Sequence, residues 1–318
     1  MKPDQYILIG LAVFLVAAIA IKEGLPKRHG AEITPESLLI GMNNPTLWIF
    51  YNTSEVNARY WWDFGARNSR AINIPLLNML YTRLAQHNGK DYKIEVLGGV
   101  SAVAEKLGWD ALPRSLKTTG KATVTEAEEA WIRTAILAKY GGLWLSPSVL
   151  SIQPIGKLPA DAIVAFGQDD APMYNSATIS PGFNALWVPK PNHPMMVKWQ
   201  ERLHSRLEGQ LGGKQSRGDS KGDWLELTRE MPAGTVRTRL DSELSRNPET
   251  GKKLELEDLF AAGTEGRLPF TVPPSTAYIV VPYGDLLNRR QWGWILRESE
   301  EQLLSSDLAI IHIIKSYP

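Results

Sequence analysis

The chain of 318 residues contains no cysteine. This absence excludes a disulfide scaffold, thiol catalysis and zinc sites with cysteine ligands. The chain also lacks an excess of one charge, because 35 lysines and arginines stand against 34 aspartates and glutamates, for a net charge of +1. Nucleic-acid-binding domains are typically strongly basic, so we expect no nucleic-acid partner.

Several catalytic signatures are missing as well. The sequence has no glycine-rich phosphate-binding loop, no His-Glu-x-x-His motif and no nucleophile elbow. The five histidines are scattered, so no Ser-His-Asp triad can be argued from them. With 43% hydrophobic residues, the chain can bury a large core and is long enough for one large domain or two small ones.

An uninterrupted apolar run, YILIGLAVFLVAAIAI, occupies residues 6–21. It is slightly shorter than the ~20 residues that a membrane-spanning helix prefers. Two interpretations remain open, a single-pass anchor and a cleaved signal peptide ending near residue 20. We favour the anchor, because only Lys2, offset by Asp4, precedes the run. Residues 1–28 are therefore predicted to be an anchor or signal segment that places the protein at a membrane, followed by a linker at 29–45.

The segment that organises the rest of the chain is EAEEAWIRTAILAKYGGLWLSPSVLSIQP, residues 126–154. Apolar residues at three- and four-residue spacing predict a helix that ends at Gly141-Gly142, because glycine accepts the left-handed turn that closes a helix. A short strand at 143–145 and the tripeptide Ser146-Pro147-Ser148 follow. The end of a strand in an α/β sheet is a usual place for a ligand.

This segment resembles the R-x-x-x-L-x-x-Y-G-G-x-[WY]-x-D-x-D motif of the DXD sugar transferases, a family that includes capsular-polysaccharide and α-1,6-mannosyl-type enzymes. The matching residues are Arg133, Leu137, Tyr140, Gly141, Gly142 and Trp144. The resemblance implies an α/β, glycosyltransferase A-type (Rossmann-like) fold. It also implies a pair of aspartates that hold a divalent metal on the diphosphate of a nucleotide sugar.

The chain departs from this pattern at the metal-binding positions. Ser146 and Ser148 stand where the family has aspartates, and Ala130 stands where an acidic residue is expected. A serine hydroxyl supplies no charge to offset a hard cation and is a poor ligand for it. We therefore expect no manganese site at this motif.

The surrounding pattern predicts a parallel α/β sheet. Apolar strands at 46–52, 92–97 and 162–167 alternate with amphipathic helices at 74–87 and 100–107. Residues 46–318 are accordingly predicted to form a single glycosyltransferase A-like domain. Residues 209–223, which are rich in Gly, Lys, Arg and Asp, are predicted to be a solvated loop, although Lys214 in it could contact a diphosphate.

The resemblance also implies where a sugar nucleotide would bind. In the family, an aromatic residue at the end of the first strand stacks on the nucleotide base. The candidates here are Trp48, Phe50, Tyr51 and Asn52, and a plain core strand is the alternative. A C-terminal histidine of the family reaches the diphosphate, and His312 is its approximate counterpart, or else an ordinary core residue. The full set of predicted donor-binding residues is Trp48, Tyr51, Arg133, Tyr140, Gly141, Gly142, Ser146, Ser148, Arg289, Arg290 and His312.

Four carboxylates are candidates for a catalytic role. Asp169 and Asp170 follow the strand at 162–167 and could hold a metal in place of the missing aspartate pair, and Glu257 and Asp258 lie in the acidic segment 254–260, where one could serve as a base. A positioned carboxylate can accept a proton from an acceptor hydroxyl. The alternatives are a solvated turn for the first pair and helix-surface charge for the second.

Two functional hypotheses follow. The first is a hexosyltransferase-like enzyme that moves a sugar from a nucleotide sugar to a glycan or lipid acceptor and stabilises the leaving group without a metal, using cations such as Arg289, Arg290 and His312. The second is a catalytically inactive protein with the same fold that serves as a membrane-tethered scaffold.

Overall fold

The computed structural model describes residues 44–52, 75–118, 124–167, 183–210, 220–262, 269–296 and 298–317. The predicted anchor at residues 6–21, the linker up to residue 43, and the candidates Asp169, Asp170 and Lys214 lie outside these ranges. Among the residues that the structure describes, no helix is both long enough and apolar enough to cross a bilayer.

A six-stranded mixed sheet is the centre of the fold, with the strand order β2-β1-β3-β6-β5-β7. Five strands run in one direction, and β6 runs against its neighbours β3 and β5. The strands are β1 (Thr46–Tyr51), β2 (Lys93–Gly98), β3 (Gly142–Leu145), β5 (Ile163–Phe166), β6 (Ala185–Val188) and β7 (Val236–Arg239).

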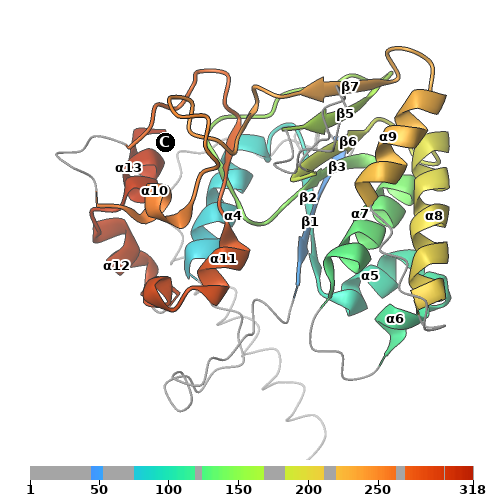
Figure 1. Ribbon diagram of the computed structural model, residues 1–318, viewed down its shortest axis with the longest axis horizontal. Helices are drawn as coiled ribbons and strands as arrows, with labels where there is room; N and C mark the ends of the chain where they lie inside the picture. The colour runs from blue at the N-terminus through green and yellow to red at the C-terminus, as the bar shows by residue number, and fades with distance from the viewer. Residues whose placement is uncertain are drawn as a thin grey trace, which may run out of the picture. The chain divides into compact units, whose positions relative to one another are not determined.

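Helices cover both faces of this sheet (Figure 1). One face is covered by α5 (Val100–Leu107), α6 (Arg114–Lys117), α7 (Glu126–Tyr140), α8 (Pro194–Gln210) and α9 (Ser220–Glu230). The helix α4 (Pro75–Asn88) lies on the other face. A sheet that is covered on both faces reads as continuous apolar runs, which is why β3, β5 and β6 are buried at every position.

Alternate side chains of strand β1 pack into two different hydrophobic cores. Successive side chains of a strand point to opposite faces. Trp48 and Phe50 therefore enter the core beneath α7 and α8, whereas Leu47 and Ile49 enter the core shared with α4.

A second, three-stranded sheet has the order β4-β9-β8 and is formed by β4 (Val149–Ser151), β8 (Glu243–Leu244) and β9 (Tyr278–Val280). A third core joins this sheet and α4 to the C-terminal helices. Those helices are α10 (Leu256–Phe260), α11 (Tyr283–Asn288), α12 (Glu300–Ser305) and α13 (Ala309–Ser316), together with the 3-10 turn η3 (Arg290–Trp292); a further 3-10 turn, η2 (Trp109–Ala111), follows α5.

The helix α7 begins and ends where its sequence indicates. Thr125 and Glu128 form a reciprocal capping box, in which the backbone N–H of Thr125 donates to Glu128 Oε2 at 2.9 Å. The helix ends at Gly141, whose φ of 66° is unfavourable for a residue with a side chain.

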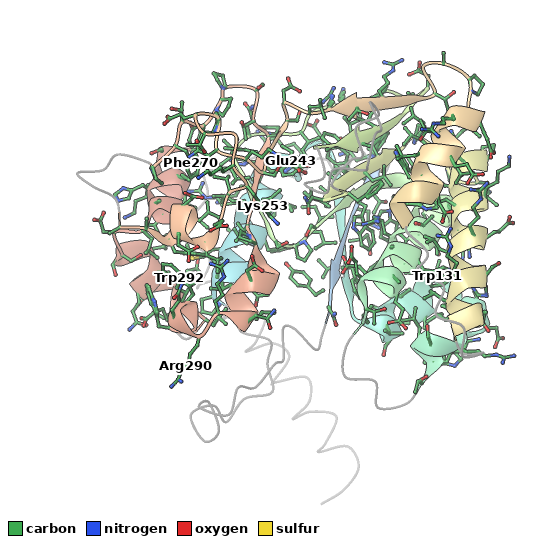
Figure 2. All side chains as sticks on the ribbon, viewed as in Figure 1. Trp131, Glu243, Lys253, Phe270, Arg290 and Trp292 are labelled. Carbon is green, nitrogen blue, oxygen red and sulfur yellow. The ribbon has the colours of Figure 1, made fainter. Side chains whose placement is uncertain are left out.

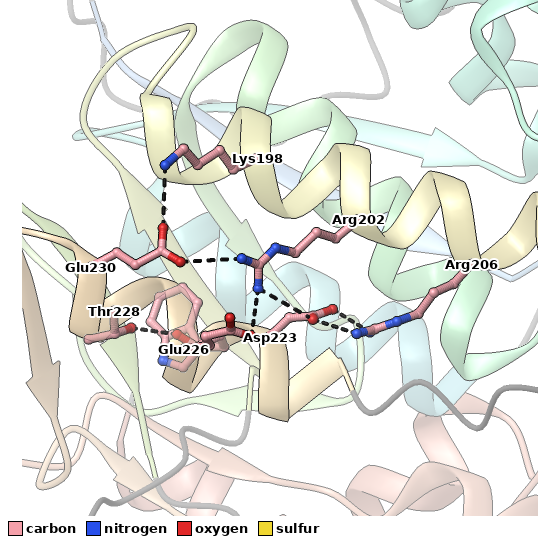
Figure 3. A network of polar contacts seen from close by, with 8 residues as sticks. Lys198, Arg202, Arg206, Asp223, Glu226, Thr228 and Glu230 are labelled. Carbon is pink, nitrogen blue, oxygen red and sulfur yellow. Dashed lines mark hydrogen bonds and ion pairs between the residues drawn. The ribbon is translucent and has the colours of Figure 1, made fainter.

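Helices α8 and α9 are joined by a network of ion pairs (Figure 3). Arg206 binds the buried carboxylate of Asp223 through both terminal nitrogens, and Arg202 bridges Glu226 at 2.9 Å and Glu230 at 3.3 Å. Bidentate arginine–carboxylate pairs fix geometry as well as charge, so this network sets the register of the two helices.

Most predicted elements are confirmed, including the helix at 100–107 and the strands at 46–52, 92–97 and 162–167. The predicted all-parallel sheet is wrong at β6, because a short, fully buried apolar strand has no feature that reveals its direction. The predicted loop at 209–223 is wrong at its C-terminal end, where α9 begins at Ser220. The apolar residues that anchor this helix, Trp224 and Leu225, lie just beyond the polar stretch.

Candidate functional site

The candidate site lies at the edge of the six-stranded sheet where the five co-directional strands end and β6 begins. We call this the carboxyl edge, and the opposite one the amino edge. In α/β sheets, ligands bind outside the carboxyl ends of the strands, where no side-chain layer continues the core.

The tripeptide Ser146-Pro147-Ser148 leaves β3 at the carboxyl edge and connects it to β4 of the second sheet. The two serine hydroxyls lie 2.9 Å apart and hydrogen-bond each other. The backbone holds both residues, because Ser146 N–H donates to Asn184 O at 2.7 Å and Val281 N–H donates to Ser148 O at 2.9 Å. Both side chains are half-buried, so the two hydroxyls are held in a fixed position and remain partly accessible to a ligand.

Asn184 carries the polar contacts from the serines to a buried carboxylate. Its backbone carbonyl accepts from Ser146, and its side-chain amide donates to Glu243 Oε2 at 3.3 Å. Ser148, Ser146, Asn184, Glu243 and Tyr278 thereby form a continuous hydrogen-bonded series, which we call the edge chain.

Glu243 is the residue that sequence reasoning missed. It is 7% exposed, and Tyr278 Oη donates to its Oε2 at 2.9 Å. Burial, and next the charge of Glu243, raise the pKa of Tyr278 well above its usual value, so the phenol remains a hydrogen-bond donor. The sequence around Glu243 is rich in charged residues and is typical of a solvent-exposed turn, and Glu243 belongs to no recognisable motif. Figure 2 shows it well inside the molecule.

Space for the Glu243 carboxylate exists because Gly167 has no side chain. Gly167 follows β5 at the carboxyl edge with φ +68°, and a Cβ there would meet the carboxylate at less than 3.0 Å. Glycine is thus required twice at this position, for the backbone conformation and for the close approach.

Arg133 is a buried cation that contacts the residue before Asn184. Its Nη1 donates to the carbonyl of Phe183, which immediately precedes Asn184, at 3.4 Å. The guanidinium carbon lies 4.9 Å from the Phe183 ring centroid and 6.0 Å from that of Trp199. Nε has no hydrogen-bond partner, and burial lowers the pKa to about 10, with Glu129 and Glu126 opposing the shift. The side chain therefore stays charged at neutral pH, in a cage of aromatic rings.

The Tyr-Gly-Gly part of the motif lies at the amino edge instead. A Cβ on Gly142 (φ +97°) would come within 3.0 Å of the Thr46 carbonyl oxygen, so glycine lets β3 start directly beside β1. Trp48 Nε1 donates to Gly141 O at 2.9 Å, and the rings of Trp48 and Tyr140 are 5.4 Å apart. The structure therefore brings Trp48, Tyr140, Gly141 and Gly142 together as the turn that sets the helix and strand, separated by the length of β3 from Ser146 and Ser148.

Tyr51 ends β1 at the carboxyl edge and is half-buried on the α4 face. Burial, and next Tyr81, raise its pKa to about 12. Its place fits the predicted strand-end aromatic better than that of Trp48, which is 3% exposed in the core.

The C-terminal candidates lie in the cluster of α10 to α13 and have local partners there. Arg289 binds Glu257 at 2.8 Å; the pKa of Glu257 is lowered by its own backbone N–H and then by Arg289. Asp258 accepts from Glu255 N–H at 2.9 Å as part of the cap of α10, and His312 contacts Asp307. Arg290 extends away from the ribbon (Figure 2) and, with Arg289 and Gln291, lines an open pocket of ≈ 770 Å³. The predicted donor-binding residues therefore lie in three parts of the fold, which are the amino edge, the carboxyl edge and the C-terminal helices.

No metal site is evident in the ranges that the structure describes, because no three His, Asp or Glu side chains converge there. Ser146 and Ser148 face each other and bring no carboxylate of their own. Glu243 is the nearest acid in the edge chain, and it is engaged by Tyr278 and Asn184.

No family model and no curated protein matches the chain. Solved structures that match include the PaToxG glycosyltransferase (11% identity, TM-score 0.35, covering 59% of this chain and 69% of that one). A transferase mutant matches at 14% identity and TM-score 0.33, covering 61% and 88%. The glycosyltransferase GlyE of Streptococcus pneumoniae TIGR4 matches at 11% identity and TM-score 0.30, covering 63% and 46%.

Proposed function

We propose that this protein is a glycosyltransferase-like enzyme that transfers a sugar from a nucleotide-sugar donor to a glycan or lipid acceptor at the carboxyl edge of the sheet. The observation that carries the proposal is the edge chain. It begins at the tripeptide Ser146-Pro147-Ser148, which ends the sugar-transferase-like motif and lies at the carboxyl edge. Its exposed end consists of Ser146 and Ser148, 2.9 Å apart. Its buried end is Glu243.

The chemistry of the edge chain suits an uncharged polyhydroxyl group. Two hydroxyls, an amide and a phenol donate and accept hydrogen bonds, and the carboxylate accepts only. The negative charge of Glu243 disfavours a phosphate beside it. The sugar of the donor is therefore assigned to the edge chain, and its diphosphate to a place nearer the cation Arg133.

Arg133 supports a leaving group without a metal. A divalent ion would neutralise the charge that develops on the departing nucleoside diphosphate. A buried guanidinium can contribute to the same stabilisation, because its field is weakly screened in a low-dielectric environment. The carboxylates that act on Arg133, Glu129 and Glu126, lie on its own helix, whereas Arg289 is bonded directly to Glu257.

The proposal includes a membrane tether formed by the apolar run 6–21. A tether would hold the enzyme beside lipid-linked or surface glycans. The donor sugar and the acceptor are set by side chains around the site and are left open.

Nucleotide release from sugar donors tests the proposal. The full chain, reconstituted in lipid nanodiscs, is incubated with UDP- and GDP-sugars, with manganese or with EDTA. We expect release of UDP or GDP that survives EDTA and falls at least tenfold in Arg133→Met. The matched control is Arg229→Met, an exposed arginine on α9. Absence of release from every donor, with no transfer to added glycans, would favour the inactive scaffold.

A further inference from the structure

The amino edge of the six-stranded sheet presents aromatic side chains to solvent. Trp109 in η2 is 53% exposed, more than any other large hydrophobic residue that the structure describes, and Tyr140 at the end of α7 is 37% exposed. Single exposed hydrophobic residues are ordinary on protein surfaces. These two differ because they lie in one region and are surrounded by lysines.

Contacts between segments far apart in sequence build this surface. Tyr140 Oη donates to Lys106 O at 2.6 Å, and Lys139 Nζ donates to the same carbonyl at 2.8 Å. Lys139 also lies 5.3 Å from the Tyr140 ring centroid. Trp109 follows Lys106 by three residues in the turn after α5.

The turn after β6 adds a further lysine. Asn192 N–H donates to Ala138 O at 2.6 Å, and the backbone of Lys190 lies against Gly141. We call Lys106, Trp109, Lys139, Tyr140 and Lys190 the amino-edge patch.

The charge of the patch is positive. The Glu95 carboxylate forms ion pairs with Lys106 Nζ at 3.2 Å and with Lys93 Nζ at 2.7 Å. One negative charge is therefore balanced against two positive charges. Lys139 points its ammonium group at backbone carbonyls. Asp110 beside Trp109 is the carboxylate within the turn, and it offsets only part of the excess.

The chain enters the fold at this same edge. β1 begins at Thr46, whose carbonyl packs beside Gly142, and Asn44 Nδ2 donates to Lys90 O at 2.9 Å. The apolar run ends at residue 21, so 24 residues (22–45) separate it from β1. A segment of that length spans at most roughly 80 Å. A bilayer that holds the run therefore lies within that reach of the start of β1 at the amino edge.

We propose that the amino-edge patch docks on the headgroup region of an anionic bilayer. Tryptophan and tyrosine favour the membrane interface, because one part of each ring system is apolar and another can hydrogen-bond. Lysines near an anionic surface are attracted by its negative potential, over about a Debye length. This inference rests on the proposed tether at residues 6–21, and it is independent of the proposed activity. Docking in this way turns the carboxyl edge, with Ser146 and Ser148, toward glycans that extend beyond the headgroups rather than toward the lipid itself.

The absence of native cysteine makes a direct test possible. Trp109→Cys provides one labelling site in the patch, where the apolar bimane ring takes the place of the indole, and Leu240→Cys, 42% exposed just after β7 at the carboxyl edge, provides a matched site. Each full-length variant carries a bimane label and is reconstituted with phosphatidylcholine vesicles with or without phosphatidylserine. Nitroxide-headgroup lipids serve as quenchers.

We expect quenching at position 109 to be several-fold stronger than at position 240 when phosphatidylserine is present. Omission of phosphatidylserine, high salt, or the substitutions Lys139→Glu and Lys190→Glu should reduce it. Equal quenching at both positions would overturn the proposal. Protein that floats with the vesicles but is unquenched at position 109 would refute docking and leave the tether intact. Protein that does not float at all would refute both. Concentration-dependent self-quenching at position 109 without lipid would instead identify a second copy of the chain as the partner.

Discussion

The Tyr278 hydroxyl donates to the Glu243 carboxylate at 2.9 Å, and both side chains are buried between the two sheets. A buried carboxylate is costly unless donors surround it. The pair therefore explains how an acid persists inside the carboxyl edge, and it connects a residue without any sequence signature to the predicted serine pair.

Removal of the Tyr278 hydroxyl should destabilise the fold. Tyr278→Phe takes one donor from a buried carboxylate, and we expect a loss of about 2–3 kcal/mol in the free energy of unfolding, measured with urea. The control is Tyr92→Phe, which takes a donor from the neutral carbonyl of Gly156 and should cost about 1 kcal/mol. A larger loss for Tyr92→Phe would contradict the assignment of Glu243 as a charged, donor-dependent residue.

Gly167 should tolerate no side chain. Gly167→Ala adds both backbone strain and a collision with Glu243, whereas Gly156→Ala adds only the strain, because Gly156 has φ +73° and open space around its Cβ position. We expect about 1 kcal/mol for Gly156→Ala and at least ~3 kcal/mol for Gly167→Ala. Thermal unfolding of both variants and of Gly167→Ala/Glu243→Ala measures this. The double variant should recover part of the loss, and strict additivity would argue against direct contact.

The glycine that starts β3 should be required for the sheet itself. Gly142→Ala would press a methyl group against the Thr46 backbone, and Gly108→Ala, with nearly the same φ and open space, is the matched control. We expect Gly108→Ala to fold with a cost of about 1 kcal/mol and Gly142→Ala to lose at least ~3 kcal/mol or fail to fold. Similar circular-dichroism melting curves for the two variants would show that the approach of β1 and β3 is not limiting.

Restored aspartates should create a metal site. The hydroxyls of Ser146 and Ser148 are 2.9 Å apart, so carboxylates at both positions repel each other until a cation lies between them. We expect Ser146→Asp/Ser148→Asp to be less stable than the parent chain in EDTA and to regain stability with manganese. At 100 times the dissociation constant the gain would be about 2.7 kcal/mol. The single variants are controls with weaker responses. If manganese leaves the melting temperature of the double variant unchanged, these positions cannot hold the ion.

The stability of the fold should fall in mild acid through His193. Burial, and then Lys190, lower the pKa of this histidine, so the unfolded chain takes up the proton first as the pH drops. Its contribution is intact above the usual histidine pKa of about 6.5 and is lost as the pH falls below that value. We expect His193→Gln to lose less unfolding free energy than the parent chain between pH 7.5 and pH 5.5. Urea unfolding of both proteins at pH 8, where His193 is neutral in the folded and in the unfolded chain, provides the baseline.

Local sequence patterns predicted an element of this fold well where the residues that determine it lie within one short segment. The helix periodicity of 126–140 and the two glycines that end it are local, so the helix–turn–strand unit was predicted from sequence. The capping box at Thr125, which the structure adds, is local as well. The direction of β6 was not predictable, because its partners β3 and β5 impose it.

The candidate site was predicted in part for the same reason. Ser146 and Ser148 follow a strand, and their position at the carboxyl edge comes from that strand alone. Glu243 acquires its role from Gly167, Asn184 and Tyr278, which are distant in sequence and meet only in the folded chain. The predicted role of Glu257 could not include its pairing with Arg289, 32 residues away.

Calorimetric titration of the full chain, reconstituted in nanodiscs, with UDP and GDP, in manganese and in EDTA, tests the proposed donor site most directly. We expect one of the two nucleotides to bind in EDTA, with an affinity that manganese leaves unchanged in the parent chain and improves in Ser146→Asp/Ser148→Asp. Binding should weaken at least tenfold in Arg133→Met and stay unchanged in Arg229→Met. Binding that requires manganese in the parent chain would contradict the metal-independent site, and binding of neither nucleotide would contradict the enzyme itself.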